Sequence, residues 1–283
     1  MNFSTLISVE GLAQFLNEPD WVIIDCRFQL DNPEKEWLDY QKAHIPGAVY
    51  ANLDDTLSGP VVPGITSRHP LPDVNIFVKK LGSWGVGPET QVIVYDDSSG
   101  KIAARLWWML RWVGHENVAL LDGGYHAWVE GGNKVNDKKP TPVQQNFTLN
   151  IQPQMLATAE NVLENFGDPN KILVDSRAPE RYRGEEEPFD PVAGRIPGAV
   201  NYFWGTNLDS QGQMQLKQVL RGRFESIFRD VPAERVTFYC GSGVTAAHNV
   251  LAVAHAGLGM ARMYAGSWSE WITDPEHPII MGK

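Results

Sequence analysis

Short apolar runs alternate along the chain with stretches of helical spacing. In the first half, runs typical of buried strands cover residues 21–25, 91–95 and 117–121. Between these runs, apolar residues recur at helical intervals over 76–81 and 102–113. Strands that alternate with helices predict an α/β fold, in which a mainly parallel sheet is flanked by helices.

The pattern occurs twice, which predicts two tandem copies of one domain. Four landmarks recur in the same order: 21–27 as 171–177, 44–49 as 195–200, 92–96 as 236–240, and 120–124 as 264–267. The repeat is much longer than that of a solenoid protein, so we expect two domains and not an array. Residues 133–150 lack periodicity and carry proline and polar residues, as linkers do. We therefore assign 1–135 to a first domain, 136–152 to a linker and 153–283 to a second domain.

The charge balance argues against some classes of partner. The 283 residues include 24 lysines and arginines and 34 aspartates and glutamates, which gives a net charge of −10. We do not expect so acidic a chain to bind nucleic acid or an anionic membrane as its main partner. The overall field would also oppose an anionic substrate, so a site for such a substrate must gather arginines locally.

The start of the chain and its cysteines bear on the cellular compartment. Residues 1–20 contain no basic segment followed by an apolar run, so we expect neither a signal peptide nor a membrane span there. The two cysteines, Cys26 and Cys240, lie far apart in the sequence and cannot build a disulfide framework. These features predict a reducing, cytoplasmic location.

Cys240 is the strongest candidate for chemistry. It lies between a predicted strand at 236–239 and a predicted helix at 245–256. Gly241 and Gly243 allow the loop to turn its backbone N–H groups toward the sulfur, next to the positive end of the helix. Such an environment lowers the pKa of a thiol and favours the reactive thiolate. The alternative is a small buried hydrophobic residue at the end of a strand.

The repeat provides an internal comparison for Cys240. The first copy has Asp96, followed by Asp97, at the matching position. An aspartate cannot act as a thiolate, and its charge would repel an anion. We therefore expect the chemistry in the second copy, with the first copy packed against it and lending residues to the cleft.

Several motifs together resemble the tandem-domain sulfurtransferases of the rhodanese family, and more narrowly its 3-mercaptopyruvate branch. They are the loop 240–245, the two Ile-Pro-Gly-Ala turns, and the segments 175–177 and 266–271. The resemblance implies two rhodanese-like domains, the first inactive, and a persulfide intermediate on the cysteine of the second. It implies no metal and no organic cofactor. A small anionic donor would give its sulfur to the cysteine, which would pass it to cyanide, a thiol or thioredoxin.

The resemblance also assigns roles within the loop. Gly241, Gly243, Val244 and Thr245 would surround the transferred sulfur, and their amides would stabilise its negative charge. Ser242 would donate a hydrogen bond to the donor or the sulfur, or would simply be small enough for a tight turn. For Thr245, we favour a helix cap over a part in the chemistry.

Arginine positions carry the recognition of the donor. By resemblance Arg181 would bind the donor carboxylate through two hydrogen bonds, and the alternative is a surface ion pair with Glu185 or Glu186. Arg177 fits a structural ion pair at a strand end better than a ligand contact. The family's second substrate arginine is missing at 187–190, and Arg195 is a candidate to replace its charge.

A histidine is expected beside the loop serine in this branch. His44 matches that histidine by resemblance, which would give a relay from Ser242 through His44 to an acid near Asp31. The alternative is a structural histidine before a turn.

Two other functions compete with the sulfurtransferase. A cysteine phosphatase needs an arginine six positions after its cysteine, and this chain has Ala246 there. A non-catalytic sulfur carrier or binding module would not need the complete loop.

For the donor, the neutral Gly241 and Ser242 favour 3-mercaptopyruvate, whereas thiosulfate enzymes place cations there. Thiosulfate stays the alternative, because the second arginine is missing.

Overall fold

The computed structural model describes residues 2–282, and these form two compact units. The first unit contains the residues up to Gly59, Pro72–Gln152 and the short segment Ser210–Met214. The second contains Pro60–Leu71, Pro153–Asp209 and the residues from Gln215 onward. Each unit therefore includes a segment whose sequence lies within the other copy of the repeat.

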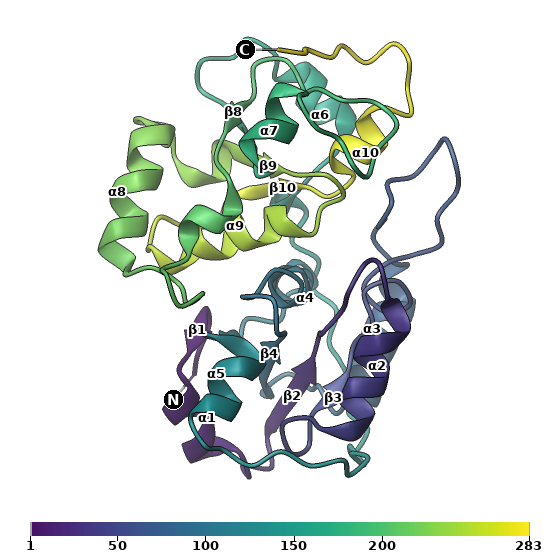
Figure 1. Cartoon of the computed structure of the whole chain (residues 1–283), viewed down its shortest axis with the longest axis vertical. Coiled ribbons are helices and arrows are strands. Elements are labelled where there is room, and N and C mark those ends of the chain that lie inside the picture. The colour runs from purple at the N-terminus through teal and green to yellow at the C-terminus, as the bar shows by residue number, and fades with distance from the viewer. Residues whose placement is uncertain (1, 283) are drawn as a thin grey trace. The chain divides into compact units, whose positions relative to one another are not determined.

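The first unit is a parallel five-stranded sheet with helices (Figure 1). Its strands pair in the order β1-β5-β4-β2-β3. The elements in chain order are β1 (Leu6–Ile7), α1 (Val9–Phe15), β2 (Trp21–Asp25), α2 (Pro33–Lys42), β3 (Val49–Tyr50), α3 (Val74–Ser83), β4 (Gln91–Tyr95), α4 (Ala103–Trp112), β5 (Val118–Leu121) and α5 (Gly124–Glu130).

The second unit repeats this topology with the strand order β6-β10-β9-β7-β8. Its helices and strands are β6 (Leu156–Ala157), α6 (Ala159–Glu164), β7 (Ile172–Asp175), α7 (Pro179–Arg183), β8 (Val200–Asn201), α8 (Lys217–Phe228), β9 (Val236–Tyr239), α9 (Thr245–His255), β10 (Arg262–Tyr264) and α10 (Ser267–Trp271). Short 3-10 turns lie at Pro153–Met155, Trp204–Asn207 and Ala233–Arg235.

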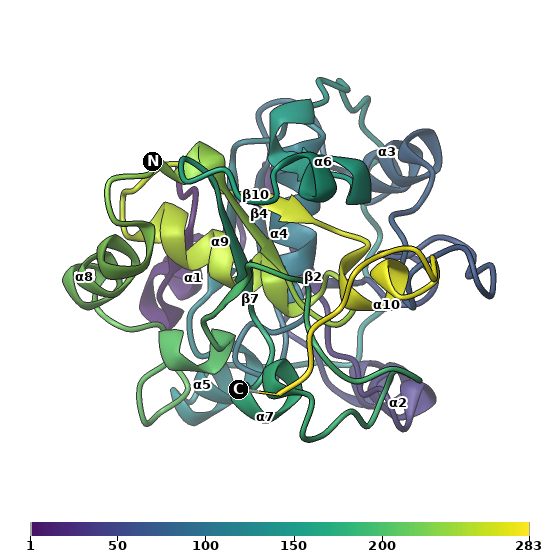
Figure 2. The same ribbon diagram turned by 90° about the horizontal axis from the view of Figure 1, so that it is seen from above.

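Helices cover both faces of the second sheet. In Figure 1, α9 lies on one side of β9 and β10, and α6, α7 and α10 lie on the other. Helix α8 packs against α9, as the view in Figure 2 also shows. The prediction of two α/β domains with parallel sheets is confirmed.

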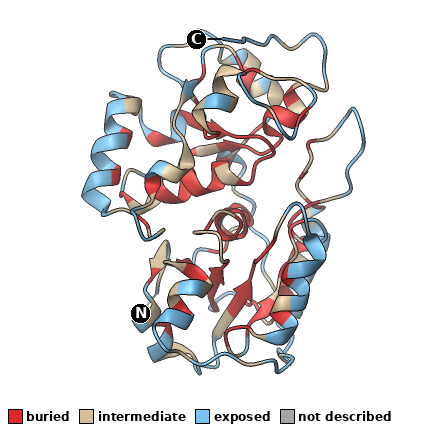
Figure 3. Ribbon diagram, in the orientation of Figure 1, coloured by how far each residue is buried: buried red, intermediate tan, exposed pale blue. Residues whose placement is uncertain are grey.

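The central strands are apolar because both of their faces are covered. All five residues of β4 and all four of β9 are buried. The helices that follow these strands, α4 and α9, are buried over most of their length, and Figure 3 shows both as largely red ribbons. Sheet and helices thus fix the loop between β9 and α9 on a rigid base.

The segment 136–152, predicted to be a linker, lies along the first unit. The N–H of Gln145 donates to the carbonyl of Gly82 at 3.0 Å, and the N–H of Asn150 donates to Val113 at 3.0 Å. A Cβ on Gly82 would lie 2.6 Å from the carbonyl oxygen of Gln145, so this close approach requires glycine. Among residues 2–282, no helix is long and apolar enough to cross a membrane.

Candidate active site

Cys240 follows β9 directly and is almost fully buried, with 2% of its surface exposed. The first residues of α10 hold the loop that begins at Cys240. The N–H of Cys240 donates to Oγ of Ser267 at 3.1 Å, and the N–H of Ser269 donates to the carbonyl of Gly241 at 2.8 Å. Gly243 has a φ of +74°, and a Cβ there would lie 2.2 Å from the carbonyl oxygen of Ala265. The loop therefore needs glycine at this position.

The loop favours the thiolate form of Cys240. Burial by itself would raise the pKa of this thiol, because it disfavours the charged form. The hydroxyl of Thr245 and the backbone N–H groups of Ser242, Ala246 and Gly243 all donate toward the sulfur, and together they hold the pKa below its ordinary value. Thr245 is therefore not the helix cap that we expected. Val244 is the N-cap residue of α9, and the Thr245 hydroxyl contacts the sulfur.

Cys26 lies in the opposite environment. It is fully buried in the first unit, and burial together with the charges of Asp25 and Asp96 raises its pKa well above the ordinary value. Its thiol donates to the carbonyl of Ile24 at 3.9 Å. The pKa values of the two thiols are therefore shifted in opposite directions, upward for Cys26 and downward for Cys240.

In the first copy, Asp96 occupies the position that matches Cys240. Its Oδ1 accepts the N–H groups of Ser98 at 2.9 Å and Gly100 at 2.8 Å, and its Oδ2 accepts those of Ile102 and Ala103, each at 2.8 Å. The amides that would hold an anionic sulfur in the second copy hold a carboxylate here. The first copy therefore keeps the anion cradle but fills it with its own side chain.

Two arginines meet at Gly241, next to Cys240. A Cβ on Gly241 would lie 2.9 Å from Nη2 of Arg68 and 3.1 Å from Nη2 of Arg181. Arg181, which the sequence analysis placed at the donor, extends from α7, whereas Arg68 comes from the segment Pro60–Leu71, which folds with the second unit. Sequence reasoning missed Arg68. The local signal was a basic pair, Arg68-His69, in a proline-rich loop that carries no other charged residue.

Buried carboxylates hold these arginines in place. Glu187 accepts from Nη2 of Arg181 at 2.6 Å, and Asp190 accepts from Nε of Arg68 at 2.8 Å and from Nη2 of Arg181 at 3.4 Å. The ion pairs of Arg181 among the described residues are thus with Glu187 and Asp190, and not with Glu185 or Glu186 as the alternative had it. Glu185 instead pairs with Arg183 at 2.7 Å.

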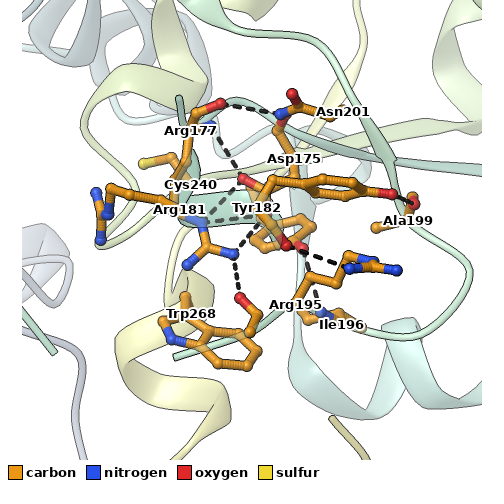
Figure 4. A network of polar contacts seen from close by, with 12 residues as sticks. Asp175, Arg177, Arg181, Tyr182, Arg195, Ile196, Ala199, Asn201, Cys240 and Trp268 are labelled. Atoms are coloured by element: carbon orange, nitrogen blue, oxygen red, sulfur yellow. Dashed lines mark hydrogen bonds and ion pairs between the residues drawn. The ribbon is translucent and has the colours of Figure 1, made fainter. Parts of the chain in front are cut away.

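Arg177 is structural, as its sequence position suggested. Figure 4 shows it beside Asp175, with which it forms an ion pair of 2.6 Å, and it also donates to the carbonyl of Gly194. Burial would lower the pKa of Arg177, but Asp175 and Glu187 raise it above its ordinary value. Arg27 and Asp25 form the equivalent pair in the first unit at 2.7 Å.

The histidine beside the loop serine is His69, not His44. Nδ1 of His69 lies 2.8 Å from Oγ of Ser242, and both groups are buried. Nδ1 of His44 instead lies 2.7 Å from the carbonyl oxygen of Tyr40, and Nε2 lies 3.1 Å from that of Lys138. His44 therefore ties the turn of the first unit to residues near 138, and the predicted relay through it is wrong.

Arg195 does not complete the arginine pair at Gly241. Its guanidinium donates to the carbonyls of Tyr182 and Gly282 and lies over the Tyr182 ring, 4.6 Å from the ring centre. Figure 4 shows the Arg195 guanidinium on the Tyr182 side of the network, away from the Cys240 thiol. Its backbone also pairs with Ile280, so Arg195 anchors the C-terminal segment.

No group of three or more His, Cys, Asp or Glu residues within 2–282 is arranged to hold a metal ion. The second unit offers a thiol of lowered pKa among backbone amides, two guanidinium groups beside it, and a hydroxyl in contact with an imidazole.

Comparisons with known proteins agree with this geometry. The Rhodanese-like domain family matches twice, at residues 8–131 and 158–274. A relative from Pseudomonas aeruginosa, named probable 3-mercaptopyruvate sulfurtransferase, is 44% identical over 100% of both chains. The human 3-mercaptopyruvate sulfurtransferase is 35% identical over 98% of this chain and 96% of its own. The thiosulfate sulfurtransferase of Cricetulus griseus is 32% identical over 99% of this chain and 97% of its own.

Solved structures give the same result. The 3-mercaptopyruvate sulfurtransferase of Leishmania major has a TM-score of 0.82 and 28% identity, over 95% of this chain and 74% of that chain. SseA from Escherichia coli has a TM-score of 0.77 and 29% identity, over 95% of this chain and 100% of that chain.

Proposed function

Because the chain belongs to the rhodanese family and is a sulfurtransferase, we propose that its donor is 3-mercaptopyruvate and that a persulfide on Cys240 carries the sulfur. Thiosulfate is the alternative donor, since relatives of both names match nearly the whole chain. The observation that carries the proposal is the convergence of Arg68 and Arg181 on Gly241, next to the thiolate. Two guanidinium groups there suit a carboxylate attached to the carbon skeleton of the sulfur donor.

The first half-reaction needs a nucleophile and a proton. The Cys240 thiolate attacks the donor sulfur, an S–S bond forms, and the C–S bond breaks with its electron pair left on carbon as the enolate of pyruvate. The thiol proton of the donor remains on the new persulfide, and its transfer to the enolate carbon gives pyruvate and an anionic persulfide. The hydroxyl of Ser242 and the imidazole of His69, 2.8 Å apart, are the groups that would move this proton.

The second half-reaction regenerates the enzyme. An acceptor thiolate or cyanide attacks the outer sulfur of the persulfide, the S–S bond breaks, and its electron pair returns to Cys240 as the thiolate. The amides of Ser242, Gly243 and Ala246 hold negative charge on sulfur in both states. Cyanide, small thiols and thioredoxin are the acceptors that we propose.

Cys26 and Cys240 are both free thiols, which supports a reducing, cytoplasmic location.

Two measurements test this proposal. Steady-state kinetics with both donors should give a higher kcat/KM for 3-mercaptopyruvate than for thiosulfate. Intact-protein mass spectrometry after donor treatment should show one added sulfur, and peptide mapping should locate it at Cys240. In the Cys240→Ser variant the added mass and the turnover should both disappear, whereas Cys26→Ser should keep both. An added sulfur on Cys26 would contradict the mechanism. A higher kcat/KM for thiosulfate than for 3-mercaptopyruvate would make thiosulfate the donor.

A further inference from the structure

The arginines beside Cys240 belong to a cluster in which every positive charge has a buried negative partner. Arg68 pairs with Asp190 at 2.8 Å, Arg181 with Glu187 at 2.6 Å, and Arg177 with Asp175 at 2.6 Å. Further pairs link the cluster internally, since Arg177 contacts Glu187 at 3.2 Å and Arg181 contacts Asp190 at 3.4 Å. Among the residues that the structure describes, these pairs join three arginines to three carboxylates, so the cluster is neutral.

The two carboxylates nearest the site are shielded from water. The side chains of Glu187 and Asp190 are 3% and 1% exposed, whereas those of Arg68 and Arg181 are 29% and 15% exposed. The negative charges are therefore held inside and the positive groups reach outward, toward Gly241. Water and salt screen buried charges weakly, so both carboxylates act on a ligand bound at the arginines.

Asp190 also holds the two arginines together, because its carboxylate accepts hydrogen bonds from both. Its Oδ1 and Oδ2 accept from Nε and Nη2 of Arg68 at 2.8 and 3.2 Å, and Oδ2 also accepts from Arg181. The ring of Phe189, the preceding residue, lies 5.5 Å from the Arg68 guanidinium and 5.0 Å from that of Arg181. One short stretch thus fixes both guanidinium groups and covers them with an aromatic face.

We propose that Glu187 and Asp190 determine which donor charge the site accepts, and that Asp190 also positions Arg68 and Arg181 as a pair. This inference rests on the proposed function, because it concerns the donor of the same site. A neutral cluster gains one net negative charge when a carboxylate monoanion such as 3-mercaptopyruvate binds. A dianion such as thiosulfate adds a second charge close to the same buried carboxylates and the Cys240 thiolate. The cluster binds a monoanion and disfavours a dianion.

The test removes one buried negative charge at a time. Asp190→Asn and Glu187→Gln keep the shape of the side chain and leave the cluster with a net positive charge. In each variant, we expect the ratio of kcat/KM for thiosulfate to kcat/KM for 3-mercaptopyruvate to rise by about tenfold at low salt. The rise should shrink as salt is added, because screening reduces a charge effect but not a change of shape.

Two further variants serve as matched controls. Glu185→Gln removes the same charge from an exposed pair, since the side chain of Glu185 is 49% exposed and bonded to Arg183, and it should leave the ratio unchanged. Asp190→Glu keeps the negative charge and should therefore keep the ratio of the two kcat/KM values. Its longer side chain should displace Arg68 and Arg181, which would raise KM for both donors. Of the two charge-removing variants, Asp190→Asn should raise KM for 3-mercaptopyruvate more, because Asp190 pairs with both Arg68 and Arg181. The ion pairs of Glu187 among the described residues are with Arg177 and Arg181.

The outcomes separate this inference from the proposed function. If the wild-type protein has a higher kcat/KM for thiosulfate than for 3-mercaptopyruvate, the proposed donor is wrong. The inference would still require the thiosulfate to 3-mercaptopyruvate ratio of kcat/KM to be higher in the variants than in the wild type. Equal losses for both donors in Asp190→Asn and Glu187→Gln, at every salt concentration, would overturn the inference and leave the proposed function intact. If Asp190→Asn fails to fold, Glu187→Gln alone decides whether a buried carboxylate sets the donor charge.

Discussion

The hydroxyl oxygen of Ser242 lies 2.8 Å from Nδ1 of His69, although 173 positions separate the two residues in the sequence. The contact exists because the segment Pro60–Leu71 folds with the second unit. The segment is held there by the N–H of Arg68, which donates to Oγ of Ser269 at 3.1 Å, and by the ion pair of Arg68 with Asp190. One loop therefore brings an imidazole to Ser242 and a guanidinium group to Gly241, both in the loop that follows Cys240.

His69→Asn should separate the two donors. Release of pyruvate from 3-mercaptopyruvate needs a proton on carbon, whereas sulfite leaves thiosulfate as an anion and needs none. We expect the variant to form persulfide from 3-mercaptopyruvate roughly 10²-fold more slowly, the usual size of a lost proton-transfer group, and to react with thiosulfate at near the normal rate. Rapid-mixing single-turnover measurements with each donor give both rates.

His44→Gln is the matched control for this experiment. The His44 ring hydrogen-bonds to two backbone carbonyls and stacks on the Tyr40 ring, all within the first unit, so its loss should lower the thermal stability and leave both single-turnover rates unchanged. Equal slowing of both donors in His69→Asn would instead assign His69 a purely structural role.

Thr245→Val should raise the pKa of Cys240, because it removes the hydroxyl that donates to the sulfur and keeps the shape of the side chain. Alkylation of Cys240 by iodoacetamide, measured against pH, reports the thiolate fraction. The midpoint of the profile should move to higher pH, while Cys26 should stay unreactive in both proteins because burial and two acidic neighbours raise its pKa. An unchanged midpoint would show that the loop amides alone hold the thiolate.

The same thiol should couple the stability of the protein to pH. The pKa of Cys240 is lower in the folded protein than in the unfolded chain, so the unfolded state binds more protons between the two values. Its contribution to the free energy of unfolding is therefore complete above the unfolded pKa and is lost as the pH falls through the folded pKa. Denaturant titrations should show this alkaline increase in wild type and its absence in Cys240→Ser. A Cys26→Ser protein should keep the increase.

The strands and the anion loop could be predicted because local sequence determines them. The strands Trp21–Asp25, Gln91–Tyr95 and Val236–Tyr239 match the apolar runs residue for residue, since burial on both faces requires such runs. The loop that follows Cys240 needs glycine at 243, and a loop of this kind directs its amides inward wherever it occurs.

The partners of the loop could not be predicted in the same way. Arg68 and His69 lie in a segment without helical or strand periodicity, and they meet Asp190 and Ser242 across 122 and 173 positions. No local pattern encodes such a contact. The resemblance pointed to His44 in this role, but its ring nitrogens lie within hydrogen-bond distance of backbone carbonyls in its own unit, as the alternative of a structural histidine before a turn implies.

Arg68→Ala and Arg181→Ala should each weaken use of the donor. Each removes a charge-assisted contact worth about 1.5–3 kcal/mol, which corresponds to roughly a tenfold to hundredfold loss in kcat/KM for 3-mercaptopyruvate. Persulfide that is already loaded on Cys240 should still pass to cyanide at a near-normal rate. Arg183→Ala, which removes an arginine of the same helix that pairs with Glu185, is the control and should change neither half-reaction. A loss of donor use in only one of the two variants would mean that the other arginine does not bind the carboxylate.

Gly241→Ala tests whether the donor carboxylate sits between the arginines. A methyl group at this position would meet the flexible ends of Arg68 and Arg181 at 2.9 and 3.1 Å, so the fold should survive while both guanidinium groups shift. We expect an unchanged melting temperature and a loss of about tenfold in kcat/KM for 3-mercaptopyruvate, since a displaced charge-assisted contact is worth at least that factor.

Two other glycines calibrate the result. Gly243→Ala should lower both stability and the thiolate fraction, because the residue has a φ of +74° and a Cβ would lie 2.2 Å from the carbonyl oxygen of Ala265. Gly222→Ala, within α8 and with no atom within 4 Å of its Cβ, should leave activity unchanged and raise stability slightly through helix propensity. If Gly241→Ala keeps full activity with 3-mercaptopyruvate, the carboxylate binds elsewhere, and Arg68 and Arg181 act on the sulfur loop and not on the donor.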